Sequence, residues 1–166
     1  MRNALLLLAL ASLTPACADN SGGPVPDGEP TSFSILEGDW SACAADSAVL
    51  RAGELADVAD NCAVGASRDL LLELDANLTE SEAVVFMQQQ VPCGSTARLE
   101  DLLVDGDAVV PWVLAADPDY GTARVTDESV LCIFEAVLLV DELADTVSEV
   151  APVVGVYNPN RPGAPE

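Results

Sequence analysis

The alternation of hydrophobic and polar residues predicts a chain built mainly from β-strands. Residues 68–75 (RDLLLELD) place leucine at alternate positions with acidic residues between them, and this period of two predicts a half-buried strand. Residues 83–91 are rich in β-branched and aromatic side chains and end at Pro92, so a strand is favoured there. Residues 79–82 (TESE) also match a helix capping box, and the alternative for residues 80–90 is therefore a helix.

The sequence Val104-Asp-Gly-Asp107 is the strongest turn signal in the chain. It separates two apolar stretches, residues 99–103 and 108–114, and Asp-Gly tolerates the positive φ angles of a tight hairpin turn. Pro111 in the second stretch predicts that this arm is an edge strand or carries a bulge. A further turn is expected at residues 117–121 (DPDYG).

The C-terminal half of the chain continues the β pattern. Residues 129–140 are almost entirely apolar and predict a strand buried on both faces, although such a run is also compatible with a helix. Residues 147–157 predict a last strand, and Pro152 places it at an edge. Acidic turns after residues 74, 104 and 140 favour a meander of hairpins. The predicted fold is mainly β, a small antiparallel β-barrel or a β-sandwich, with one or two short helices, one of them within residues 44–60.

The N-terminal residues have the layout of a secretory signal. One positive charge precedes an apolar run over residues 4–13, which is too short to span a bilayer, and small residues come after it. Residues 13–17 (LTPAC) resemble a bacterial lipobox, and this resemblance implies a signal peptide over residues 1–16 and lipid attachment at Cys17. The alternative is an A-x-A cleavage site at residues 16–18, which would release a soluble protein that begins at Asp19.

The remainder of the chain divides into three parts. Residues 17–32 contain many Gly, Pro and polar residues, and we expect a flexible tether behind the lipidated cysteine. Residues 33–157 have the length of one ordinary domain. Residues 158–166 (NPNRPGAPE) are expected to form a disordered tail. We therefore expect an exported, membrane-anchored lipoprotein of the cell envelope, or alternatively a secreted soluble protein.

The charge of the chain restricts its partners. Cleavage before Cys17 removes Arg2 and leaves 28 acidic residues against five basic ones, a formal charge of −23. Nucleic-acid phosphates and anionic lipid headgroups repel such a surface, so we expect no nucleic-acid partner and membrane contact only through the N-terminal lipid. This acidity suits solubility at high ionic strength, and a compositional bias of the source would produce it equally well.

The missing residue types exclude several chemistries. The chain contains no His and no Lys, which removes Ser–His–acid triads, Cys–His pairs, His-ligated zinc and Schiff-base catalysis. No catalytic, cofactor-binding or metal-ligating set is predicted. Carboxylate-pair hydrolysis stays open in principle, but so many acidic residues produce pairs by chance.

Four cysteines remain after Cys17 is used or removed, an even number that suits an oxidising compartment. Three connectivities are possible, and we favour Cys43–Cys62 with Cys93–Cys132. The first pair would close the least regular stretch of the domain. The second would join the end of one predicted strand to the body of another.

Residues 35–40 (ILEGDW) place Gly38 two residues before Trp40. A Gly-x-Trp that enters the first strand resembles the start of lipocalins and related small bacterial β-barrels. The resemblance implies an eight-stranded, lipocalin-like barrel, a Trp40 that closes one end of it, and an arginine that packs on this ring, for which Arg124 and Arg161 are the candidates. It also implies an interior that can hold one small apolar ligand.

The function predicted from the sequence is that of a non-enzymatic envelope or surface lipoprotein that binds a small apolar ligand or an envelope component. The alternatives are a structural or surface-coat lipoprotein without a ligand and, least favoured, a carboxylate-dependent hydrolase.

Overall fold

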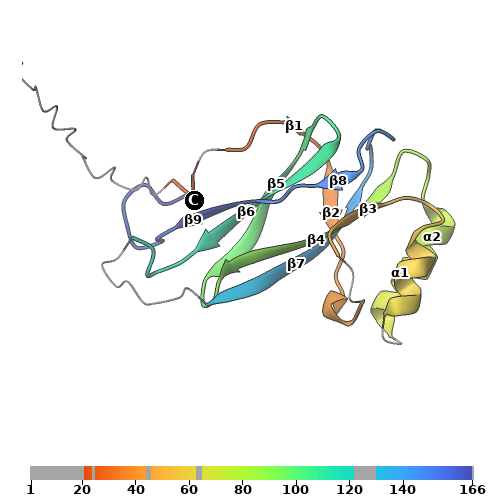
Figure 1. Cartoon of the computed structure of the whole chain (residues 1–166), viewed down its shortest axis with the longest axis horizontal. Helices are drawn as coiled ribbons and strands as arrows, with labels where there is room; N and C mark the ends of the chain where they lie inside the picture. The colour runs from red at the N-terminus through yellow and green to blue at the C-terminus, as the bar shows by residue number, and fades with distance from the viewer. Residues whose placement is uncertain (1–20, 24, 44–45, 63–64, 122–129, 166) are drawn as a thin grey trace, which may run out of the picture.

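A computed structural model describes residues 21–23, 25–43, 46–62, 65–121 and 130–165. The predicted signal peptide, Cys17 and Arg124 lie outside these residues. The described chain is mainly β, and its strands form two sheets, with two α-helices and a 3-10 helix beside them (Figure 1). The described strands do not form a closed barrel.

The first sheet has the order β1-β5-β6-β8, and β9 also pairs with β6. Its strands are β1 (Glu29–Pro30), β5 (Thr96–Asp105), β6 (Ala108–Ala116), β8 (Glu149–Val150) and β9 (Val153–Tyr157). The predicted hairpin is confirmed: β5 and β6 pair antiparallel, and Gly106 between them has a φ of 63°. β8 and β9, by contrast, run parallel to β6, so the predicted meander of hairpins is wrong.

The second sheet has the order β2-β7-β4-β3 and its pairs are all antiparallel. Its strands are β2 (Phe33–Ile35), β3 (Ala48–Leu50), β4 (Ala83–Pro92) and β7 (Leu131–Val140). Neighbours in this sheet are far apart in sequence. The strand favoured over residues 83–91 is confirmed, and the alternative helix over residues 80–90 is wrong.

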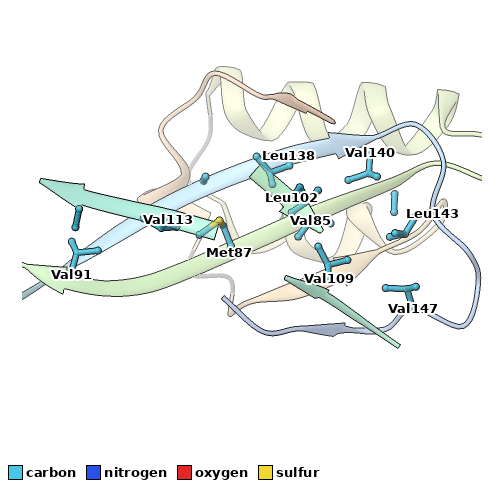
Figure 2. Close-up of a cluster of buried hydrophobic side chains, with 13 residues drawn as sticks. Val85, Met87, Val91, Leu102, Val109, Val113, Leu138, Val140, Leu143 and Val147 are labelled. Carbon is cyan, nitrogen blue, oxygen red and sulfur yellow. The ribbon is translucent and has the colours of Figure 1, made fainter. Parts of the chain in front are cut away.

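The inner face of the second sheet packs against the first sheet. Figure 2 shows side chains from both sheets meeting in one cluster, among them Val85 and Met87 of β4, Leu138 of β7, and Val109 and Val113 of β6. Leu143 and Val147, from the segment that links β7 to β8, extend the same cluster. This cluster is the main hydrophobic core.

The other face of the second sheet packs against the helices. Val84 and Phe86 of β4 and Val137 of β7 contact a second cluster that contains Leu55 and Leu71. Leu55 begins α1 (Leu55–Asn61), and Leu71 lies in α2 (Ala66–Asn77); the two helices lie side by side next to β3 (Figure 1). Because residues 83–87 of β4 and the C-terminal half of β7 are covered on both sides, their sequences are apolar at consecutive positions.

The strand predicted for residues 68–75 is wrong, because these residues belong to α2. The alternation of leucines there is compatible with a helix, since Leu71, Leu74 and Leu78 are also three to four residues apart and pack in the second cluster. Leu71, which did not fit the alternation, is fully buried. No residue of this stretch is β-branched, and Leu, Arg and Glu all favour helix. The short helix expected within residues 44–60 is α1, which begins after Gly53 and ends at Asn61.

The predictions made from the two prolines and from the long apolar run have different outcomes. β6 is a central strand, and the irregularity in its pairing lies on β5 between Leu99 and Asp101 rather than at Pro111. Pro111 is accommodated because β8 and β9 are interrupted beside it, so no neighbour on that side requires its missing N–H. The edge position expected for Pro152 is confirmed, since it lies between β8 and β9 at the sheet margin. β7 is buried on both faces only near its C-terminal end, and residues 130–133 are exposed.

The domain extends beyond residues 33–157 at both ends. Part of the predicted tether is ordered against the first sheet, because Glu29 and Pro30 pair with β5 and Gly22 is buried. The predicted disordered tail is also wrong for its first residues. Asn158 is only 3% exposed, and its side-chain amide donates hydrogen bonds to the carbonyls of Pro118 and Tyr120 in the predicted turn.

Candidate functional site

An open crevice lies between the two sheets at the margin formed by β2, β5 and β7. Its volume is about 520 Å³, and most of the residues that line it are apolar: Ile35, Leu36, Glu37, Gly38, Trp40, Ala97, Arg98, Leu99, Phe134, Glu135 and Ala136. Ligand pockets for small molecules usually have volumes of about 300–1,000 Å³ and mainly apolar linings. The crevice therefore has the size and lining of a binding site for a small apolar group.

Two strands from opposite sheets provide the apolar walls. Ala97 and Leu99 of β5 and Phe134 of β7 are partly buried and pack against the main core, which also contains Ala136. Because side chains alternate along a strand, residues 97 and 99 lie on one face of β5, and residues 134 and 136 lie on one face of β7. The crevice is thus a continuation of the core to the surface, where the core side chains leave the space between the sheets incompletely filled.

Trp40 lies at the rim of this crevice, in the 3-10 helix η1 (Trp40–Cys43). The ring nitrogen of Trp40 donates a hydrogen bond to the carbonyl oxygen of Leu36 at 2.9 Å. Its ring meets Phe86 edge to face, with 5.9 Å between ring centroids and an interplanar angle of 83°. The hydrogen bond and the ring contact together hold the indole in place, which gives the crevice a fixed wall.

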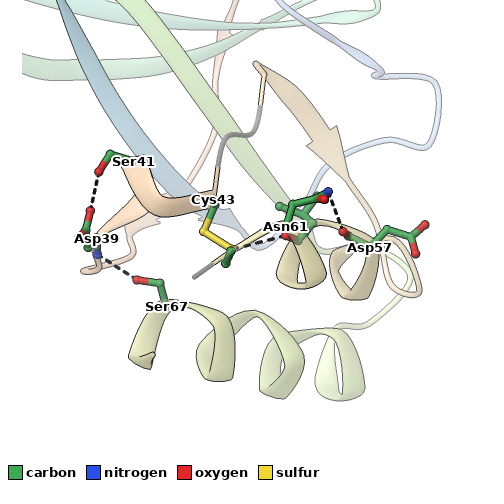
Figure 3. The surroundings of a disulfide bond; sticks show 8 residues. Asp39, Ser41, Cys43, Asp57, Asn61 and Ser67 are labelled. Carbon is green, nitrogen blue, oxygen red and sulfur yellow. Dashed lines mark hydrogen bonds between the residues drawn. A yellow bond between two sulfur atoms is a disulfide. The ribbon is translucent and has the colours of Figure 1, made fainter. Parts of the chain in front are cut away.

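The segment before Trp40 is fastened to α2. The backbone N–H of Asp39 donates to the hydroxyl oxygen of Ser67 at 2.9 Å, and the Ser41 hydroxyl donates to the Asp39 carboxylate at 2.7 Å (Figure 3). Gly38 is required by close packing, because a Cβ at this position would lie 2.8 Å from two atoms of the Trp40 ring. These contacts fix the direction in which the chain leaves β2.

The predicted Gly38 and Trp40 thus lie together at one site, but in a different setting from the one expected. They come after β2 and do not enter a strand. The guanidinium of Arg161 donates a hydrogen bond to the carbonyl oxygen of Gly121. Trp40 instead begins the short helix η1, which ends at Cys43, and the disulfide of Cys43 links this helix to the end of α1.

The two disulfides connect the cysteines in the predicted way. Cys43 is joined to Cys62, with 3.7 Å between Cα atoms, which is shorter than the usual range of about 4.4–6.8 Å, and Cys93 is joined to Cys132, with 4.9 Å. Cys43 and Cys62 are buried in the second cluster and connect η1 to the end of α1 (Figure 3). The bond Cys93–Cys132 joins the residue directly after β4 to the exposed beginning of β7, and these two strands already pair.

Charged residues are present at the crevice, but they do not form a metal centre. Glu37, Glu135 and Arg98 line it, and Arg98 pairs with Glu100 at 2.9 Å. Glu135 accepts a hydrogen bond from the side chain of Gln88 at 2.9 Å. Within the described ranges, no group of three or more His, Cys, Asp or Glu residues could hold a metal ion.

Sequence reasoning missed the walls of the site, Ala97, Leu99, Phe134 and Ala136. The sequence signal for these four residues is the alternation of apolar residues along two strands. The same alternation is found on any strand face that packs in a closed core, so it does not identify the wall of a crevice. Only the packing of the sheets shows that these four residues lie where the core opens to solvent.

Comparisons with protein-family models, with curated proteins and with solved structures found no match to this chain. None of the helices that the structure describes is long and apolar enough to cross a membrane.

Proposed function

We propose that this protein is a non-enzymatic binding protein of the cell envelope, attached to a membrane by lipid on Cys17, and that the crevice beside Trp40 is its recognition site. The ligand class is a small apolar molecule or an apolar group of another envelope component. The observation that carries the proposal is the inter-sheet crevice, because it combines an apolar lining with an ordered aromatic rim. A preformed site of this kind needs little ordering on binding.

The fold proposed for this role is an open β-sandwich. Its support is the shared core between the two sheets and the separate strand order of each sheet. In an open sandwich the ligand enters between the sheets at their margin, whereas in the lipocalin-like alternative it would enter through one end of a barrel.

The anchor part of the proposal rests on the signal-like N-terminus, on Ala16 before Cys17 and on the even number of remaining cysteines, which form two disulfides. The test is expression in a bacterial host and then membrane fractionation and mass spectrometry of the N-terminus. We expect the protein in the membrane fraction with acyl chains on Cys17, and a Cys17→Ser variant without them. A soluble wild-type protein that begins at Asp19 would refute the anchor and support secretion.

The crevice is tested with a neutral naphthylamine dye that becomes fluorescent in apolar sites. Ala97→Phe should fill the crevice and weaken dye binding about tenfold or more, which corresponds to about 1.4 kcal/mol. Thr96→Phe is the matched control, because neighbouring strand residues face opposite ways and Thr96 is exposed. Equal dye binding by both variants and the wild type would place the dye elsewhere and refute the crevice as the site.

A further inference from the structure

One side of β7 is left without a neighbouring strand next to the crevice. β4 pairs with β7 along residues 131–140, but β2 covers the opposite side only at residues 138–140. After Ile35 the chain makes one more hydrogen bond, from the N–H of Leu36 to the carbonyl of Val137, and then turns away towards Trp40. The described strands thus leave residues 131–136 of β7 with a free edge.

The hydrogen-bond pattern shows which N–H and C=O groups of residues 131–136 point away from β4. In an antiparallel ladder the N–H and C=O of one residue point to the same side, and the side alternates along the strand. Because the carbonyl of Val137 points to β2, the N–H and C=O groups of residues 131, 133 and 135 point away from β4 in the same direction. Pro92, which has no N–H, lies opposite Leu131, as this pattern requires.

Among the described residues, this edge lacks the features that usually prevent pairing with another strand. Natural edge strands usually carry lysine, proline or a bulge that prevents pairing. Here the side chains are apolar and unusually exposed: Val130 is 71% exposed, Leu131 50% and Ile133 55%. The crevice lies directly beside the edge, since Phe134, Glu135 and Ala136 line it.

We infer that this edge binds an extended polypeptide segment of a partner protein by β-strand addition, with apolar residues of the segment entering the crevice. A strand placed beside β7 would make main-chain hydrogen bonds to residues 131, 133 and 135. Alternate side chains of that strand would lie between Phe134 and Leu99. The inference rests on the proposed binding role of the crevice and specifies its ligand.

The charge of the site indicates the chemistry of the segment. Three charged residues line the crevice: Arg98 pairs with Glu100, whereas Glu37 and Glu135 take part in no salt bridge within the described part of the chain. The whole chain carries a formal charge of −22, so a second copy would be repelled and a basic segment attracted. Glu135 alternates with Phe134 and Ala136 along β7, so it lies on the face that the alternate residues of an added strand would share. The expected partner segment therefore alternates apolar residues, which face the crevice, with lysine or arginine, which lie on the face of Glu135.

The experiment uses a short synthetic peptide that alternates valine and lysine, titrated into the full chain by calorimetry. The same peptide with N-methyl groups on the edge-facing amides is the ligand control, since it cannot donate these hydrogen bonds. Ile133→Pro removes one outward N–H without affecting the β4 ladder, and we expect it to weaken peptide binding about tenfold, whereas Ile133→Val should change it less than twofold.

The outcomes separate this inference from the proposed function. Peptide binding that is lost on N-methylation and weakened by Ile133→Pro supports strand addition. Equal binding of the unmodified and the N-methylated peptide overturns it. A dimer that is detected by sedimentation and excludes the peptide also overturns it, because a second copy of the chain would then occupy the edge. If the naphthylamine dye binds and the peptide does not, only this inference fails; if neither binds, the crevice itself is not a binding site. The N-methyl comparison holds even if the proline variant does not fold.

Discussion

The disulfide Cys43–Cys62 should be a large part of the stability of this domain. It closes a separation of 19 residues between η1 and the end of α1. In the chain-entropy model, a closed loop of this length stabilises the folded state by about 3.2 kcal/mol at 25 °C. Typical domains are stable by only about 5–15 kcal/mol, so the loss of this bond is a substantial fraction of the total. With an unfolding entropy of about 2.1 cal/mol/K per residue, the melting temperature should fall by roughly 10 °C.

The assay is urea unfolding of a Cys43→Ala/Cys62→Ala variant, monitored by far-UV circular dichroism. The comparison is a Cys93→Ala/Cys132→Ala variant, whose separation of 39 residues predicts a slightly larger loss of about 3.9 kcal/mol. Both variants should keep the folded spectrum in the absence of urea. A variant without Cys43–Cys62 that unfolds at the wild-type midpoint would refute the reasoning, and so would a loss much greater for the shorter loop than for the longer one.

The remaining predictions concern single contacts. Gly38→Ala should destabilise the domain by about 1–3 kcal/mol through overpacking against the Trp40 ring, measured by the urea midpoint. Hydrogen bonds from Thr79, chiefly its backbone N–H, hold the pKa of the half-buried Glu82 below its ordinary value of 4.5. This small stabilisation is therefore present above the ordinary pKa and is lost as the pH falls through the lowered one; NMR titration of the Glu82 carboxyl should show a midpoint below 4.5. Gly155→Ala should detach the residues around Gly22, because a Cβ there would collide with the Gly22 carbonyl, and limited proteolysis should then cut the N-terminal segment faster.

Each of these predictions has a clear counter-result. Gly65→Ala is the control for Gly38, since a Cβ at Gly65 meets no atom within 4 Å, and equal midpoints for both variants would contradict the packing argument. A Glu82 midpoint at or above 4.5 would contradict the hydrogen bond to Thr79. Unchanged cleavage of Gly155→Ala would show that the N-terminal segment does not lie against β9.

Local signals in the sequence determined a good part of the fold. The hairpin at Gly106 depends on a two-residue turn that needs positive φ, and the strands on either side are predicted by their composition. One hydrogen bond of the capping box at residues 79–82 does form, because the Glu82 carboxylate accepts a hydrogen bond from the backbone N–H of Thr79. The chain after Glu82 nevertheless forms a strand and not a helix, because residues 83–91 are β-favouring and pack in the sheet.

Tertiary packing decided the features that local periodicity left ambiguous. The leucines of residues 70–74 fit both a strand and a helix, and the burial of Leu71 against the second sheet selects the helix. The order of strands in each sheet, the parallel pairing of β9 and the docking of residues 29–30 depend on contacts between distant segments. These contacts have no signature in a local window of sequence.

The candidate site shows the same division. The sequence singled out Gly38 and Trp40 as a candidate motif and favoured one of three possible pairings of the four cysteines, and the structure has that pairing. The sequence could not identify the crevice or the free edge of β7. Both exist because β2 ends after three residues, which leaves part of β7 unpaired and the space between the two sheets open at this margin. The two sheets are assembled from strands that are remote in sequence, so this incomplete coverage arises only when the whole chain has packed.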